Sequence, residues 1–256
     1  MSVSAPPGTE AKIVGAAKKA GVQWVMPTCY GTDIQNETLA RENLHGAIAL
    51  RNIKTVADAG INWVALVCSF WYEFSLSVGA DWYGFDIPNK KVTFYDDGNT
   101  RINTSTWRQC GRALASLLSL KELPEDENDT SPTLSNWRNK GLYISSFLAS
   151  QRDMLDSLHR VLGDSDADWT IETESTSARY ARGQERMKEE GAAIRSGFGL
   201  CLYARTFYPN GDGNFEAKHG LANEVLGLPK EDIDEATARA VEISKKSGGE
   251  YNPAKA

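Results

Sequence analysis

Hydrophobic residues along the chain form short runs that follow helix-like stretches, and this arrangement occurs twice in nearly the same form. Residues 20–25, AGVQWV, are echoed by residues 59–64, AGINWV. The runs that these copies open, 22–26 and 61–67, are apolar at consecutive positions, as are parallel strands covered on both faces by helices. A helix, a glycine and a buried strand, repeated in this order, predict an α/β protein with a doubly wound parallel sheet.

The stretches that precede the two strands have the spacing of amphipathic helices. The first covers residues 10–20, and the second covers residues 37–59 with an interruption at Gly46. Gly21 and Gly60 follow these stretches, at the position past a helix end where the chain commonly takes the left-handed conformation.

Later segments predict a more mixed region. Residues 91–95 and 100–103 are strand-like and flank the turn-forming sequence DDGN, which predicts a β-hairpin. A helix is expected over residues 107–120, and the pattern towards the carboxyl end is mostly helical. The fold class expected is therefore a partial, Rossmann-like doubly wound sheet followed by a mixed, mostly helical region.

Composition excludes several classes of function. The 256 residues carry a formal net charge of −6, which argues against nucleic acid and against an anionic membrane surface as partners, because both are bound mainly through Lys and Arg. The four cysteines form no CxxC pair, and none of the three histidines has a neighbour at metal-ligand spacing. We therefore expect a cytoplasmic protein with free thiols, no metal site, and histidines on the surface or on helix faces.

Side chains able to contact a ligand follow the two predicted strands, at the sheet edge where ligands bind in parallel α/β proteins. These residues are Pro27, Thr28, Cys29 and Tyr30 after the first strand, and Cys68, Ser69 and Phe70 after the second. An equally open alternative is that the first loop is only a turn, and the aromatic residues are expected in the core. No GxGxxG, GxxxxGK[ST], GxSxG or HExxH motif occurs, so the chain has no phosphate-binding glycine loop.

Several segments resemble the NmrA-like and isoflavone-reductase-like family. Residues 16–33, AAKKAGVQWVMPTCYGTD, are similar to the family's helix, AG stop, strand and P-S-E-F-G-like loop. Residues 58–74 resemble the next helix and strand, and residues 97–112 resemble a D-G-N segment and the helix after it. The likeness extends more loosely through residues 142–163. The later segments, 168–171, 204–208 and 220–223, resemble fungal members in particular.

This resemblance implies a short-chain-dehydrogenase-like protein that binds NADP(H). It makes residues 1–120 the C-terminal part of an NAD(P)-binding domain and residues 121–256 the substrate-side region with a helical extension. Reductase members transfer hydride to small aromatic or phenolic molecules, whereas other members are non-catalytic redox sensors that regulate a partner protein. A remnant that binds no cofactor is the third alternative. The implied cofactor contacts are the residues after the two strands, 27–30 and 68–70.

Two departures from the family bear on catalysis. The family's first strands and glycine-rich loop have no counterpart, so we expect a chain truncated at its amino end. Ala49 stands near the position of the family's catalytic lysine, which leaves Tyr30 and Lys54 as candidate proton donors. Without the first strands, the strand at 22–26 becomes an edge that is apolar on both faces, and this predicts marginal stability or self-association.

Overall fold

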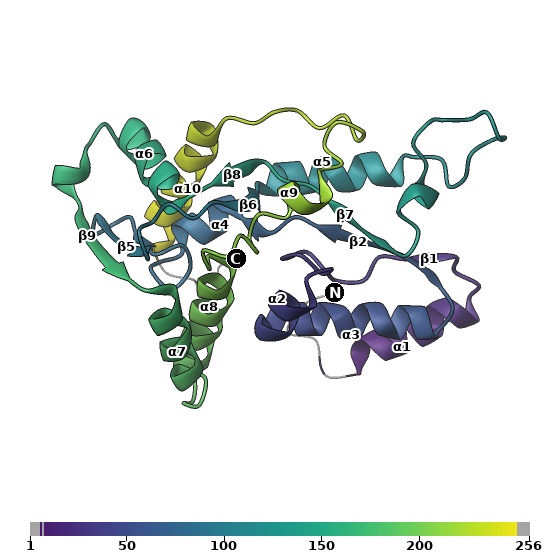
Figure 1. Ribbon diagram of the computed structural model, residues 1–256, viewed down its shortest axis with the longest axis horizontal. Helices are drawn as coiled ribbons and strands as arrows, with labels where there is room; N and C mark the ends of the chain where they lie inside the picture. The colour runs from purple at the N-terminus through teal and green to yellow at the C-terminus, as the bar shows by residue number, and fades with distance from the viewer. Residues whose placement is uncertain (1–5, 7, 250–256) are drawn as a thin grey trace.

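The computed structural model describes Pro6 and residues 8–249 as an α/β protein, which confirms the predicted fold class (Figure 1). None of the helices in these residues is both long and apolar enough to cross a lipid bilayer. The helices are α1 (Thr9–Lys19), α2 (Glu37–Glu42), α3 (Leu44–Asp58), α4 (Tyr72–Ser77), α5 (Trp107–Leu118), α6 (Gln151–Leu162), α7 (Thr176–Arg186), α8 (Ala192–Thr206), α9 (Glu216–His219) and α10 (Ile233–Ser247).

The two strands of the sequence repeat lie side by side in one parallel sheet. Its order is β1 (Trp24–Val25), β2 (Asn62–Val67) and β7 (Lys140–Tyr143). Gly21 and Gly60 both have positive φ angles, +70° and +73°, as the helix–glycine–strand pattern predicts.

Helices cover both faces of β2, which explains why its sequence is apolar at consecutive positions. Val64 and Leu66 pack in the same cluster as Leu117 of α5. Ala65 and Val67 point to the opposite face, where they pack with residues that include Ala49 of α3. A strand buried on both faces needs no alternation of polar and apolar residues.

The break in the second predicted helix lies at Asn43, so the predicted interruption at Gly46 is wrong. The buried Asn43 side chain accepts hydrogen bonds from the N–H groups of His45 (3.1 Å) and Gly46 (3.3 Å), which caps α3 after α2 has ended. Gly46 has a different role, because a Cβ atom there would lie 2.6 Å from Cα of Ala40. Asparagine at a helix start satisfies amide groups that would otherwise lack partners, and it therefore divides a stretch of helical spacing.

The predicted β-hairpin is also wrong, although both of its strands exist. The segments β5 (Lys91–Tyr95) and β6 (Ile102–Ser105) belong to different sheets. β5 pairs with β4 (Phe85–Asp86) and β9 (Thr170–Glu174), whereas β6 pairs with the strands β3 (Phe70–Trp71) and β8 (Phe147–Ala149). Only β4 lies close in sequence to its partner β5; the other partners are distant, and the turn between β5 and β6 only redirects the chain.

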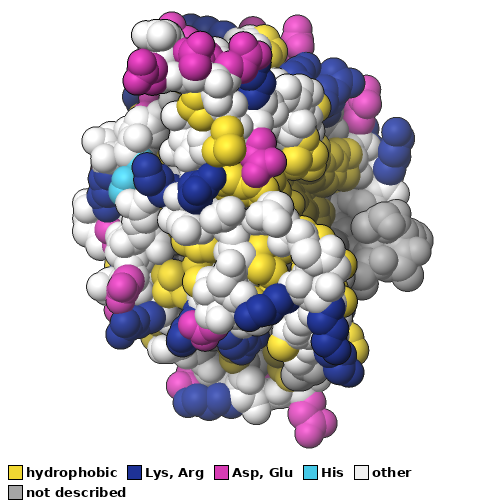
Figure 2. Space-filling model, turned by 90° about the vertical axis from the view of Figure 1, so that its right-hand side faces the viewer, with side chains coloured by type: hydrophobic (Ala, Val, Ile, Leu, Met, Phe, Trp, Pro, Cys, Tyr) yellow, Lys and Arg dark blue, Asp and Glu magenta, His cyan; other side chains and the backbone are white. Residues whose placement is uncertain are grey.

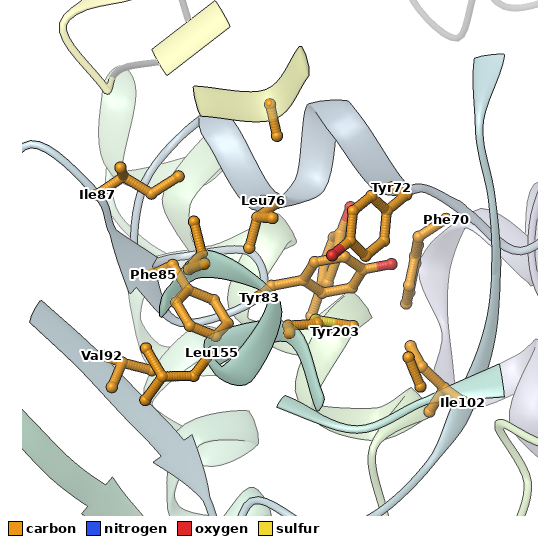
Figure 3. Close-up of a cluster of buried hydrophobic side chains, with 14 of the residues drawn as sticks. Phe70, Tyr72, Leu76, Tyr83, Phe85, Ile87, Val92, Ile102, Leu155 and Tyr203 are labelled. Atoms are coloured by element: carbon orange, nitrogen blue, oxygen red, sulfur yellow. The ribbon is translucent and has the colours of Figure 1, made fainter. Parts of the chain in front are cut away.

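A cluster of aromatic side chains joins the regions 1–120 and 121–256 (Figure 3). Phe70 stacks on Tyr203 of α8 with ring centroids 3.9 Å apart. The buried hydroxyl groups are satisfied, since Tyr203 pairs with Ser75 and Tyr72 pairs with Thr237, each at 2.7 Å. Because buried polar groups without partners are costly, these pairs fix how α8 and α10 sit against α4.

The helices α7 and α8 cross with their backbones nearly in contact. A Cβ atom at Gly183 would lie 2.7 Å from Sγ of Cys201 and 2.9 Å from the carbonyl oxygen of Gly197. Glycine at this crossing therefore sets the position of α8.

The strand β1 lies at one edge of its sheet, because within the described residues it pairs only with β2. Figure 2 shows the side of the molecule on which β1 lies, where hydrophobic side chains gather in a hollowed band between charged regions. Val22, just before β1, is 43% exposed. An apolar, unpaired edge of this kind favours pairing with another chain.

We expect Gly183→Ala to destabilise the protein by about 1–3 kcal/mol, because the new methyl group overpacks the α7–α8 crossing. The control is Gly15→Ala in α1, where a Cβ atom meets nothing within 4 Å, and where alanine should stabilise the helix by up to ~1 kcal/mol. Urea denaturation measures both changes in the free energy of unfolding. Equal effects of the two substitutions would contradict the described crossing.

We expect the purified chain to self-associate, and Val22→Lys to weaken this association because a charge beside the β1 edge opposes strand pairing. Sedimentation velocity over a range of concentrations measures it. Val225→Lys is the control, since Val225 is 50% exposed and lies between α9 and α10. A monomer that unfolds in one sharp transition would count against the prediction.

Candidate functional site

A pocket of about 350 Å³ lies where the loops that follow β1 and β2 meet α8. Its walls are mostly apolar and aromatic. The lining consists of Tyr30, Gly31 and Thr32 after β1, His45 of α3, Ser69, Phe70, Trp71 and Phe74 after β2, Trp82, and Arg195, Phe198, Leu202 and Tyr203 of α8. This is the edge of a parallel sheet at which ligand pockets are expected.

Gly31 is the point at which the two loops and α3 meet. Its carbonyl oxygen accepts a hydrogen bond of 2.9 Å from the N–H group of Ser69. A Cβ atom at Gly31 would lie 2.7 Å from Nδ1 of His45, so only glycine allows the imidazole ring to take its place.

Ser69 adopts a conformation that is uncommon for a residue with a side chain. Its φ angle is +55°, in the left-handed region, at a cost of roughly 1–2 kcal/mol. Strain of this size persists where surrounding contacts impose it, and such positions cluster at ligand sites. The residue is buried, and its hydroxyl group donates no hydrogen bond to any described residue.

Three of the residues predicted to contact a ligand line the pocket, namely Tyr30, Ser69 and Phe70. The other four lie outside its lining and are Pro27, Thr28, Cys29 and Cys68. Burial raises the pKa of the Cys29 thiol to about 12, and its Sγ contacts the carbonyl oxygen of Ala49 at 3.8 Å. Cys68 packs in the cluster that faces α5.

The two candidate proton donors lie in different surroundings. Tyr30 reaches the pocket, although burial raises the pKa of its hydroxyl group, which donates to Sδ of Met26 at 3.4 Å. Lys54 does not line the pocket. Its side chain is 74% exposed and pairs with Asp58 one turn along α3, at 2.8 Å.

His45 is a pocket residue that the sequence analysis did not propose for the site. It occupies the first turn of α3, behind the Asn43 cap, and its ring lies against Gly31. Burial lowers the pKa of the imidazole, which favours the neutral form. Recognition of Asn43 as a helix cap would have placed His45 near the sheet edge, four residues before Ala49 on the same helix face.

A polar cluster of Asp33, Tyr143 and His219 holds the loop after β1 in place. The carboxylate of Asp33 is 1% exposed, accepts a hydrogen bond from Oη of Tyr143 (2.8 Å), and lies 2.9 Å from Nε2 of His219. The two rings, of Tyr143 and His219, stack with centroids 4.5 Å apart. No group of three or more acidic, cysteine or histidine side chains in the described residues is arranged to hold a metal ion.

The burial of His45 predicts a pH dependence of stability. Because its pKa is lower in the folded protein, the unfolded chain binds a proton here more readily, and stability is lost as the pH falls from about 6.5, the ordinary value, towards the folded pKa. We expect the wild-type protein to lose stability relative to His45→Phe over this range, in urea denaturation at several pH values. A difference between the two proteins that does not change with pH would show that the ring is not buried.

No model of a known protein family matches the chain, and no curated protein matches it in sequence. Solved structures match its fold over most of its length. The leucoanthocyanidin reductase of Vitis vinifera, solved with NADPH, is 13% identical with a TM-score of 0.66, and the match covers 93% of this chain and 74% of that chain.

Two further structures are similar in the same way. An isoflavone reductase is 18% identical with a TM-score of 0.65, over 92% of this chain and 72% of that one. An NADPH-dependent quinone oxidoreductase of Escherichia coli, solved with NADPH, is 16% identical with a TM-score of 0.58, over 94% and 74%. The chain therefore has the α/β fold of isoflavone-reductase-like reductases, as the resemblance in its sequence implies.

Proposed function

We propose that the chain is an NADP(H)-linked oxidoreductase of the isoflavone-reductase-like kind that acts on a small molecule. The observation that carries the proposal is the position of the pocket, at the carboxyl ends of β1 and β2, in a fold shared with reductases that were solved with NADPH. We propose a cytoplasmic location because all four cysteines are free thiols, as is usual in a reducing compartment.

The pocket residues suit one end of a dinucleotide. A volume of about 350 Å³ with walls such as Phe70 and Trp71 accommodates a planar ring, and Tyr30, Ser69 and His45 supply polar atoms. A reduced nicotinamide bound there supplies a hydride. The diphosphate of the cofactor normally rests on a glycine-rich turn at a helix start, and the sequence contains no such motif.

A non-catalytic redox sensor that acts on a partner protein is the second candidate. The observation in its favour concerns Ala49 of α3, which is buried in a hydrophobic cluster. It stands near the position where the resemblance places a catalytic lysine. This candidate predicts cofactor binding without turnover. A chain that binds no cofactor remains the third outcome of the same experiment.

Thermal unfolding with three ligands tests the proposal. NADPH and reduced nicotinamide mononucleotide should both raise the unfolding midpoint, since binding at one hundred times the dissociation constant adds about 2.7 kcal/mol. Adenosine 2′,5′-bisphosphate should raise it little, because the residues of the pocket suit the planar end of the cofactor. NADPH oxidation with 1,4-benzoquinone then separates a reductase from a sensor.

Two exposed tryptophans offer a matched pair of variants. Trp71 lines the pocket, whereas Trp107 lies outside its lining, with ring centroids 6.5 Å apart. Trp71→Ala should weaken NADPH binding by roughly three- to tenfold, through lost aromatic contact of about 1 kcal/mol. Trp107→Ala should leave binding unchanged. No shift by any ligand in a folded sample would reject both the reductase and the sensor.

A further inference from the structure

Of the three histidines in the chain, only His45 has neither ring nitrogen hydrogen-bonded to a described residue. His159 lies between two carboxylates, with Nδ1 2.6 Å from Asp164 and Nε2 2.8 Å from Asp166. Nε2 of His219 lies 2.9 Å from the carboxylate of Asp33. Because polar atoms in a largely apolar pocket usually have partners, the unpaired nitrogens of His45 point to a ligand.

The position of His45 is fixed although its nitrogens are free. Asn43 holds its backbone N–H group, and the close approach of Ala40 to Gly46 fixes the next residue of α3. The Nδ1 and Cε1 atoms of the ring lie against Gly31, so Nε2 is the nitrogen farther from the Gly31 backbone. A group held in this way keeps one orientation towards the pocket, as proton transfer requires.

The surroundings of His45 combine apolar walls with few other polar groups. Ser69 presents a hydroxyl group to the same pocket, and the titratable or charged side chains that share it are Tyr30, Arg195 and Tyr203. The hydroxyl group of Tyr203 is hydrogen-bonded to that of Ser75. Burial is the cause of the lowered pKa of His45, so a neutral imidazole with one free acceptor nitrogen faces the pocket near neutral pH.

We propose that His45 is the proton-transfer residue of this pocket and that it takes the proton of an acidic hydroxyl group on a bound aromatic ligand. The O–H bond of the ligand breaks, the proton binds Nε2, and an imidazolium ion faces the oxyanion, towards which Ser69 can donate. In the opposite direction the imidazolium ion returns the proton to oxygen. The assignment rests on the proposed function for its place in a reduction, but its test needs no cofactor.

The probe is 4-nitrophenol, whose absorbance reports its ionisation. At a pH where the free phenol is mostly un-ionised, the wild-type protein should raise the ratio of ionised to un-ionised phenol about tenfold on binding, because the proton passes to His45 and the imidazolium ion that forms stabilises the phenolate. His45→Phe keeps the bulk of the ring, and His45→Gln keeps hydrogen bonding without titration. Both should bind the probe, as measured by quenching of tryptophan fluorescence, and neither should show the absorbance shift.

Lys54→Gln is the matched control, because Lys54 lies on the exposed side of α3, and this variant should ionise the probe as the wild type does. A second measurement uses the wild-type protein alone. Modification by diethyl pyrocarbonate, mapped by mass spectrometry, should be slowed at His45 by 4-nitrophenol and unchanged at His159 and His219.

Ionisation of the probe by His45→Phe to the wild-type extent would overturn the assignment, and so would a failure of the wild-type protein to bind the probe. An ionisation shift without any response to NADPH would reject the proposed reductase and leave the role of His45 standing. A response to NADPH without the ionisation shift would reject the role of His45 and leave the proposed function standing.

Discussion

The pocket depends on the close approach of three chain segments at Gly31. The carbonyl group of Gly31 holds Ser69, and the space that a Cβ atom would need is filled by the ring of His45. These contacts join the loop after β1, the loop after β2 and the first turn of α3. Because protein interiors are densely packed, a larger residue at this point would displace Ser69 and His45 together.

The opposite wall of the pocket is equally constrained, but by stacked rings. Phe70 follows Ser69 directly and stacks on Tyr203 of α8, so the strained residue at the loop is continuous with the aromatic core. Tyr83 adds an edge-on contact to both rings and hydrogen bonds to Thr104 at 2.7 Å. Buried networks whose polar atoms all have partners are rigid, and this rigidity explains how an apolar pocket stays open beside them.

The sequence predicted the parts of this structure that depend on local pattern. The doubly apolar strands, their glycine stops and the parallel pairing of β1 with β2 follow from periodicity and from Gly21 and Gly60. The sequence did not predict the separation of β5 from β6, because strand partners are chosen by packing over long sequence distances.

The same difference applies to the site. Tyr30, Ser69 and Phe70 could be found because they follow strands, and the ends of parallel strands share one edge. His45 could not be found by this reasoning, since it belongs to a helix whose start was assigned to the wrong residue. The wall from α8 was equally hidden, because Tyr203 and Leu202 are more than a hundred residues from the loops that they face.

Ion pairs also hold α8 beside those loops. The guanidinium group of Arg205 is 3% exposed and pairs with Glu42 of α2 and with Asp212. Asp212 also accepts a hydrogen bond of 2.7 Å from Asn36, the residue that caps α2. Because Arg205 is buried and charge-assisted hydrogen bonds are strong, these contacts tie the position of α8 to that of α2. Since α2 leads directly into Asn43 and His45, one short helix fixes both the proton-transfer residue and the wall that faces it.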